Sequence, residues 1–163
     1  MSSPVVRCTL TDLPAAEQRA FRAAVDQARL GLEESGVPVG SSLLRGDEIV
    51  AAVRNRRVQE GDPIAHGEMN CLRLAGRQAT YADTVLVTTL SPCDMCTGAI
   101  SLFKIPRVIV GEADSFVGGH DRLAAAGVEV VLVDDDECKS LMQEFMTRFP
   151  EVWAEDIAEP DAG

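Results

Sequence analysis

Runs of β-branched residues alternate with helical segments from about residue 84 onward, and this alternation limits the fold more than any other feature. Residues 84–89 read Thr-Val-Leu-Val-Thr-Thr, which is typical of a buried strand. Ser91-Pro92 ends that strand. The elements expected next are a helix at 93–103, a strand at 107–111, a helix at 121–126, a strand at 129–133 and a helix at 137–149. Such alternation predicts an α/β sandwich whose sheet is parallel at least in this half.

The first half of the chain predicts a long helix followed by a hairpin. A helix is expected over residues 11–35, with Thr11 or Asp12 as its N-cap and Gly36 at its end. The other expected elements are a hairpin of residues 39–44 and 49–53, a loop at 55–65 and a short helix from about 66 to 76. Because no linker or repeat divides the sequence, we expect one domain over residues 1–163, with an acidic tail from about 157.

The charge balance argues for a small-molecule substrate rather than a nucleic acid. The chain has 26 acidic and 15 basic residues, a net charge of −11, whereas nucleic acids are bound largely through Lys and Arg. The short group Arg54, Arg56 and Arg57 is soon followed by acidic residues and reads as a solvated segment. We therefore expect no nucleic-acid partner.

The sequence does not predict export or membrane insertion. Its N-terminus lacks a basic segment followed by an apolar stretch. The longest apolar runs, such as residues 128–133, are too short to span a bilayer. We expect a cytoplasmic protein with no membrane partner.

Two short segments carry the chemistry: His66-Gly67-Glu68 and Pro92-Cys93-Asp94-Met95-Cys96. Cys93 and Cys96 have i, i+3 spacing at a helix start, so both thiolates project from one face, where the positive end of the helix favours their ionised form. His66 supplies a nitrogen ligand from another helix start. Three mixed Cys and His ligands plus a water form the pattern of a catalytic zinc. A redox role for the Cys-x-x-Cys pair alone leaves His66 and Glu68 without a function.

Glu68 completes a hydrolytic site. At a helix start, with Gly67 between them, His66 and Glu68 can reach the same cavity. Zinc lowers the pKa of bound water from about 15.7 towards about 7, and a neighbouring carboxylate can accept the released proton and pass it on. His-x-Glu followed by Pro-Cys-x-x-Cys is the signature of zinc deaminases.

The chain resembles the cytidine deaminase superfamily, and within it the fungal-type cytosine deaminases. The resemblance covers most of the chain, from the first helix to Asp156. It is carried by Gly36-Val37-Pro38-Val39-Gly40, Asn55, His66-Gly67-Glu68, the run from Thr88 to Ile100, Val110-Gly111-Glu112, Phe116, Val133-Asp134-Asp135, and Trp153 with Glu155-Asp156-Ile157. It implies a three-layer α/β/α fold with a mixed five-stranded sheet, a homodimer, one zinc ion per subunit and a place in pyrimidine salvage.

The resemblance also implies roles for individual residues. Glu68 is the proton carrier, and His66, Cys93 and Cys96 hold the zinc ion. Asn55 and the main chain of Gly67 and Cys93 hold the ring and the attacking hydroxyl. The Ser91 carbonyl and Asp156 face the leaving amino group. The residues that pack around the ring are Val39, Phe116, Trp153 and Ile157. By residue type alone, Asn55 is more often a turn former, Phe116 and Trp153 are ordinarily core residues, Asp156 competes as a solvated surface residue, and His120 reads as a loop residue.

The expected reaction is zinc-dependent hydrolytic deamination of a free nucleobase, with cytosine giving uracil and ammonia. Departures from the family at Arg56-Arg57-Val58, Ala65 and residues 115–121 keep the choice of ring open. The alternatives are the same chemistry on isocytosine, azacytosine, an aminotriazine or a purine base. The more distant alternatives are a tRNA adenosine deaminase and a non-catalytic zinc protein.

Overall fold

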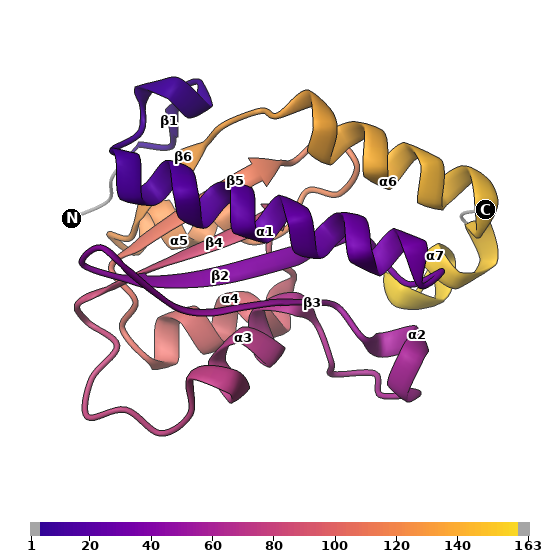
Figure 1. Cartoon of the computed structure of the whole chain (residues 1–163), viewed down its shortest axis with the longest axis horizontal. Coiled ribbons are helices and arrows are strands. Elements are labelled where there is room, and N and C mark those ends of the chain that lie inside the picture. The colour runs from indigo at the N-terminus through magenta and orange to yellow at the C-terminus, as the bar shows by residue number, and fades with distance from the viewer. Residues whose placement is uncertain (1–3, 160–163) are drawn as a thin grey trace.

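A computed structural model of the protein describes residues 4–159, in which a mixed sheet lies between two layers of helices (Figure 1). Its six strands are β1 (Val6–Arg7), β2 (Gly40–Arg45), β3 (Glu48–Arg54), β4 (Thr84–Leu90), β5 (Arg107–Glu112) and β6 (Glu129–Leu132), in the order β1-β6-β5-β4-β2-β3. Strands β4, β5, β6 and β1 are parallel, whereas β2 runs antiparallel to both β3 and β4. The predicted α/β sandwich is confirmed.

The predicted count of five strands is wrong. The sixth strand is β1, in which Val6 and Arg7 pair in parallel with Val131 and Leu132 of β6. Two residues are too few to show the alternation by which a strand is recognised in a sequence. Only the tertiary pairing makes this segment part of the sheet.

The helices cover the two faces of the sheet unequally. They are α1 (Ala15–Glu33), α2 (Arg57–Glu60), α3 (Gly67–Ala75), α4 (Asp94–Leu102), α5 (His120–Ala125), α6 (Asp136–Arg148) and α7 (Pro150–Asp156). Helices α1 and α6 lie over one face, and α3, α4 and α5 lie over the other (Figure 1). Alternate residues of β5 point to the two sides, with Val108 and Val110 in one hydrophobic core and Ile109 in the other. None of the helices within residues 4–159 has the length and apolarity to cross a bilayer.

The start of the first helix differs from the prediction. Asp12 does not cap α1, because its Oδ2 accepts hydrogen bonds from the main-chain nitrogen of Thr9 (2.9 Å) and from the Thr9 hydroxyl (2.8 Å). These bonds form a separate 3₁₀ turn, Leu10–Asp12, and α1 begins only after Pro14. The local side-chain bonds therefore shorten the helix at its N-terminus.

Two segments predicted without regular structure contain short helices. The predicted loop at 55–65 includes α2, which ends at Gly61 in a left-handed conformation (φ 61°). No helix was predicted after residue 149, but residues 150–156 form α7, which has Pro150 at its first position. The other predicted helices and strands are found within one residue of their expected bounds. The single domain over residues 1–163 stays a prediction, and residues 160–163 of the expected acidic tail lie outside the described part.

A carboxylate at the end of α1 holds α2 in place. Glu34 accepts hydrogen bonds from Nε of Arg54 (3.1 Å) and from Nε2 of Gln59 (2.8 Å), and its Oε2 lies 3.4 Å from Nη1 of Arg56. These groups come from α1, the end of β3 and α2. The network therefore joins the end of α1 to the end of β3 and to α2, mainly through Arg54 and Gln59, which make the shorter contacts.

Replacing Glu34 by glutamine is expected to lower the free energy of unfolding near neutral pH by about 1 kcal/mol or less, because the pairs are partly exposed. The hydrogen bonds from Arg54 and then Gln59 lower the pKa of Glu34 from 4.5 to about 2. A lowered folded-state pKa gives stability that is present above the unfolded pKa of 4.5 and is lost as pH falls towards 2. Urea titrations across that range should show the two proteins converging at low pH.

The matched control is Glu33→Gln, which removes the same charge one residue earlier. Within residues 4–159 the structure records no ion pair for Glu33. The difference in free energy of unfolding between Glu33→Gln and wild type should not shrink as the pH falls from 4.5 to 2. Identical pH profiles for the two variants would contradict the role assigned to Glu34.

Candidate active site

Three side chains from the N-termini of two helices converge where β4 ends. His66 and Cys93 are the N-cap residues of α3 and α4, and Cys96 lies in the first turn of α4. Nδ1 of His66 lies 3.5 Å from Sγ of Cys93 and 3.8 Å from Sγ of Cys96. All three ligand atoms lie within 4.8 Å of one another. The structure thus brings together the three predicted metal ligands.

The spacing of these atoms fits a tetrahedral zinc ion. With Zn–N near 2.0–2.1 Å and Zn–S near 2.3 Å, tetrahedral coordination separates nitrogen from sulfur by about 3.5–3.6 Å. The observed separations of 3.5 and 3.8 Å agree. Among residues 4–159 the metal-binding group comprises these three side chains, which leaves the fourth coordination position for water or substrate.

The electrostatics of the group favour a thiolate. A hydrogen bond from the Cys96 thiol is the main cause that holds the pKa of the Cys93 thiol well below its usual value, and contact with His66 lowers it further against the opposing effect of burial. The N-terminus of α4 also favours negative charge at this position. Cys93 is therefore ready to bind a divalent cation as a thiolate.

Glu68 lies directly beside the metal-binding group. It is the second residue of α3 and is 4% exposed. Its Oε2 lies 3.3 Å from Sγ of Cys96, and its Oε1 accepts a hydrogen bond of 2.7 Å from the Thr88 hydroxyl. Burial raises the pKa of the Glu68 carboxyl, although the bond from Thr88 opposes the shift. A carboxyl with a raised pKa next to a metal site is suited to carry a proton.

Sequence reasoning missed Thr88 as the partner of Glu68. Its β-branched side chain is already explained by its place in the buried strand β4. Nothing in its local sequence indicates which residue its hydroxyl contacts. The resemblance included Thr88 without giving it a role.

The metal-binding group opens into a cavity of about 650 Å³. Its lining includes every residue predicted to contact the substrate except Gly67, namely Val39, Asn55, Ser91, Cys93, Phe116, Trp153, Asp156 and Ile157. An added Cβ at Gly67 would lie 3.1 Å from the carbonyl oxygen of Val39. Gly67 therefore packs against the cavity wall, and only its main chain is available to a ligand.

Asp156 belongs to the site and not to a solvated surface. Its side chain is 7% exposed, and its Oδ1 lies 3.6 Å from Nε2 of His66. The other ring nitrogen of His66, Nδ1, faces the two cysteines. Burial raises the pKa of Asp156, against the opposing influence of His66 and Arg57. At 3.6 Å the two groups are not hydrogen-bonded, so Asp156 acts on the imidazole through its charge.

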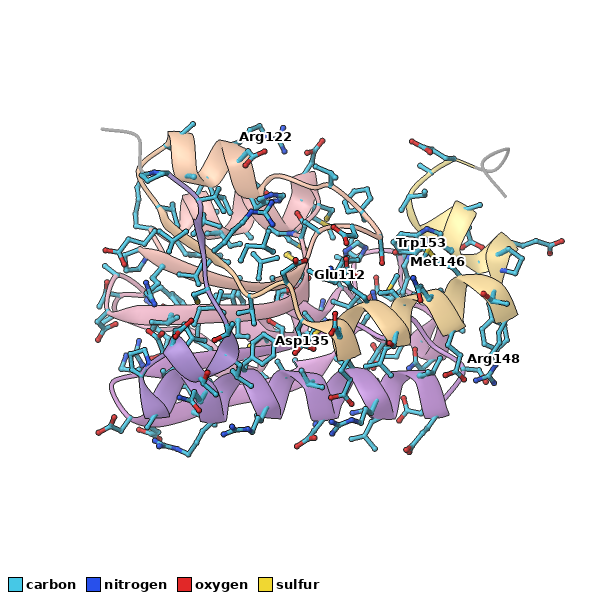
Figure 2. All side chains as sticks on the ribbon, turned by 90° about the horizontal axis from the view of Figure 1, so that it is seen from above. Glu112, Arg122, Asp135, Met146, Arg148 and Trp153 are labelled. Atoms are coloured by element: carbon cyan, nitrogen blue, oxygen red, sulfur yellow. The ribbon has the colours of Figure 1, made fainter. Side chains whose placement is uncertain are left out.

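Two aromatic residues close one side of the cavity. Phe116 and Trp153 meet edge to face, with ring centroids 6.2 Å apart at 90°. Figure 2 shows Trp153 of α7 near Met146 of α6, and both pack against the hydrophobic cluster around Phe145.

Glu112, at the end of β5, holds the loop before Phe116 (Figure 2). Its Oε2 accepts hydrogen bonds from the main-chain nitrogens of residues 114 (2.7 Å) and 115 (2.9 Å).

The divergent segment after Phe116 forms another wall. The Ser91 hydroxyl accepts a hydrogen bond from the main-chain nitrogen of Gly118 (2.9 Å) and forms a second hydrogen bond with Nδ1 of His120, 2.6 Å away. The main-chain nitrogen of Gly119 donates to the carbonyl oxygen of Pro92 (2.7 Å). His120, expected in a loop, is the buried first residue of α5. These bonds fix the segment against the start of α4.

Replacing Gly118 by alanine is expected to cost about 1–3 kcal/mol of stability and to lower kcat/KM. The added Cβ would lie 2.0 Å from the carbonyl oxygen of Pro92, so the segment must move away from Ser91. The control is Gly98→Ala on α4, where an added Cβ meets no atom within 4 Å; alanine there should stabilise the helix by about 0.5–1 kcal/mol. Thermal unfolding and steady-state kinetics measure both variants. Equal melting temperatures and equal kcat/KM for the two variants would contradict tight packing of this wall.

Residues 14–112 match the cytidine and deoxycytidylate deaminase zinc-binding region. This stretch includes His66, Glu68, Cys93 and Cys96, and it covers more than half of the chain. The chain belongs to this deaminase family.

Two curated relatives and one solved structure illustrate the family relationship. The deaminase is 43% identical to the cytosine deaminase of Candida albicans over 146 residues, which cover 88% of this chain and 97% of that protein. It is 34% identical to a tRNA-specific adenosine deaminase of Streptococcus pyogenes over 103 residues, 61% of this chain and 65% of the other. The structure of guanine deaminase from Nitrosomonas europaea matches with a TM-score of 0.68 and 21% identity over 88% of this chain and 87% of that one, a likeness of fold.

These findings test the expectations from the sequence. Membership of the deaminase family confirms the resemblance and the expected enzyme class, a zinc-dependent deaminase. The matched zinc-binding region and the geometry of His66, Cys93 and Cys96 together confirm zinc as the cofactor. The roles of the individual substrate-contacting residues stay predictions.

Proposed function

We propose that this protein hydrolyses the exocyclic amino group of free cytosine, giving uracil and ammonia. The observation that carries the proposal is the buried Glu68 carboxylate, which lies 3.3 Å from a thiol of the metal-binding group and lines the same cavity. The relative named cytosine deaminase, which aligns over nearly its whole length, supports cytosine as the ring. The net charge of −11 weighs against a polyanionic substrate.

Glu68 moves two protons in turn during the proposed reaction. Zinc, held by His66, Cys93 and Cys96, makes water acidic enough to react near neutral pH. Glu68 accepts a proton from the attacking water and delivers it to the ring nitrogen next to the carbon under attack. Glu68 then takes the proton of the hydroxyl group added to that carbon and passes it to the amino group, so that the carbon–nitrogen bond breaks, ammonia leaves, a carbonyl forms and the carboxylate is regenerated. Thr88 keeps Glu68 oriented throughout.

Polar groups at the two ends of the cavity orient the ring. The Asn55 side chain and the main-chain N–H of Gly67, at the first position of α3, hold the ring oxygen, because such N–H groups lack a partner within the helix. The Ser91 carbonyl and Asp156 accept hydrogen bonds from the departing amino group. Asp156 is suited to this task because its buried Oδ1 has no hydrogen-bond partner among the described residues.

An ammonia-release screen of the zinc-loaded protein tests the proposal. Cytosine, isocytosine, azacytosine, aminotriazines, guanine and cytidine are compared by kcat/KM. Cytosine is expected to be turned over best, because Phe116 and Trp153 pack together where a ribose would extend. Faster turnover of cytidine than of cytosine would overturn the proposed pocket. Absence of ammonia from all these rings would overturn the function.

A purine base is the second candidate. The cavity of about 650 Å³ falls within the range of sites that hold ligands much larger than a pyrimidine, so the same carboxylate and metal-binding group could meet a bicyclic ring. A higher kcat/KM for guanine than for cytosine in the same screen would favour this candidate.

We also propose that the enzyme acts in the cytoplasm as a homodimer. Exposed apolar side chains at the C-terminal ends of α3 and α4, namely Leu74, Leu102 and Phe103, support an interface between copies on that face. Light scattering coupled to gel filtration should give the mass of two chains. A mass of one chain, 17.5 kDa, would exclude the dimer.

A further inference from the structure

Arg57 joins two parts of the cavity wall that lie far apart in the sequence. It is the first residue of α2, and its side chain is 12% exposed. One partner of Arg57 is Asn55, two residues earlier. The others lie on α7, at the end of the described chain. A cation so strongly buried requires nearby negative charge.

The guanidinium of Arg57 pairs with two carboxylates of α7. Its Nε lies 3.1 Å from Oδ1 of Asp156, and its Nη1 lies 3.3 Å from Oε1 of Glu155. The contact between Nε and Asp156 is an ion pair and not a hydrogen bond, which leaves that oxygen available to a donor in the cavity. The same helix carries Trp153, and Ile157 follows as its C-cap.

The main chain of Arg57 orients Asn55. Its N–H donates a hydrogen bond of 2.9 Å to Oδ1 of Asn55. Because an N–H can only donate, the acceptor must be the amide oxygen, which leaves the amide nitrogen as the group that Asn55 offers to the cavity. Arg57 therefore contacts both polar residues proposed to hold the ring, one through its main chain and one through its side chain.

We propose that Arg57 is a positioning residue that holds α7 closed over the bound ring, an inference that rests on the proposed function. Its side chain fixes Asp156 at the amino group of the substrate and keeps Trp153 against Phe116. Apart from these ion pairs, α7 follows α6 directly through Phe149 and packs through Val152 and Trp153 in the hydrophobic cluster around Phe145. Arginine suits the task better than lysine, because its planar fork reaches two carboxylates at once.

The neighbouring Arg56 provides a matched control. It pairs with Glu34 and Glu60, at 3.4 and 2.7 Å, and does not line the cavity. Arg56→Gln and Arg57→Gln make the same chemical change one residue apart. Only the second is expected to loosen α7.

Trp153 reports the position of α7 without reference to activity, because it is the only tryptophan in the chain. In Arg57→Gln, its fluorescence should become more sensitive to acrylamide quenching than in wild type. For the proposed substrate cytosine, kcat/KM should fall about 10- to 100-fold, mainly through a higher KM. A variant that is merely less well folded would lower the apparent kcat at unchanged KM. Arg57→Lys should recover part of both effects, and Arg56→Gln should match wild type in both.

A double-mutant cycle with Asp156→Asn completes the experiment. If Arg57 acts through Asp156, the double variant should lose much less kcat/KM than the product of the two single losses. Equal Trp153 quenching and equal KM in Arg57→Gln and Arg56→Gln would overturn the inference. If wild type deaminates none of the rings, the proposed function fails, and the comparison of Trp153 quenching still decides whether Arg57 holds α7.

Discussion

Replacing Glu68 by glutamine is expected to lower kcat for ammonia release by about 10²- to 10⁴-fold, the usual contribution of a general acid–base group. Glutamine has the same size and can still accept the hydrogen bond from the Thr88 hydroxyl, but it cannot carry a proton. Zinc content should be unchanged, because Glu68 is not one of the three ligands. Steady-state ammonia assays and metal analysis of the same samples measure both quantities.

The fold is expected to tolerate this substitution. Burial raises the pKa of the Glu68 carboxyl, which means that the folded protein disfavours its charged form. A neutral glutamine avoids the desolvation cost, so the unfolding transition should not move to lower temperature. Wild-type turnover in Glu68→Gln would eliminate Glu68 as the proton carrier.

Thr88→Val is the comparison variant. Valine keeps the shape of the buried side chain but cannot donate a hydrogen bond to Glu68. The carboxylate remains present but less well oriented, so kcat should fall by less than in Glu68→Gln. A larger loss in Thr88→Val would indicate that the threonine hydroxyl itself takes part in the reaction.

Replacing Cys96 by serine is expected to abolish both zinc retention and turnover. A serine hydroxyl remains protonated and is a poor zinc ligand, whereas a thiolate binds zinc strongly. The variant should also unfold at lower temperature than zinc-loaded wild type. At free zinc about 1,000 times the Kd, binding to the folded state alone contributes about 4 kcal/mol. Metal analysis after dialysis and thermal scans with and without added zinc measure these effects.

Cys71→Ser separates zinc binding from the general loss of a buried thiol. Cys71 is fully buried, and burial raises its pKa to about 12, so it stays a neutral thiol. This variant should keep about one zinc ion per chain, and its melting temperature should still rise when zinc is added. Cys96→Ser should show neither response. Zinc retention by Cys96→Ser would mean that another side chain supplies the third ligand.

Most secondary structure follows from local sequence signals. Residues 84–89 form most of β4 because β-branched side chains favour strands, and Pro92 lies just before the N-cap of α4. Helix α1 ends at Glu33, before the predicted limit at Gly36. The predicted elements were wrong where pairing with a distant strand or a local side-chain hydrogen bond determined the structure. Strand β1 exists only through pairing with β6, and the start of α1 is moved by the bonds between Thr9 and Asp12.

The metal-binding group was predictable for the same reason. Cys93 and Cys96 lie one helical turn apart, and His66 and Glu68 flank a helix start, so short segments of sequence already specify their geometry. Asn55, Phe116, Trp153 and Asp156 were assigned through family resemblance. Their residue types alone are equally consistent with turn, core or surface positions.

By itself, the sequence determined the chemical type of this protein: an imidazole, two thiolates and a carboxylate in spacings that suit zinc-dependent hydrolysis. Only the tertiary structure decided which groups hold the catalytic residues in place. The Thr88 hydroxyl reaches Glu68 across 20 residues of sequence, and His120 reaches Ser91 across 29. Arg57 meets Asp156 from a distant part of the sequence. Local periodicity carries no information about such contacts, because they depend on how the sheet and the two helical layers pack together.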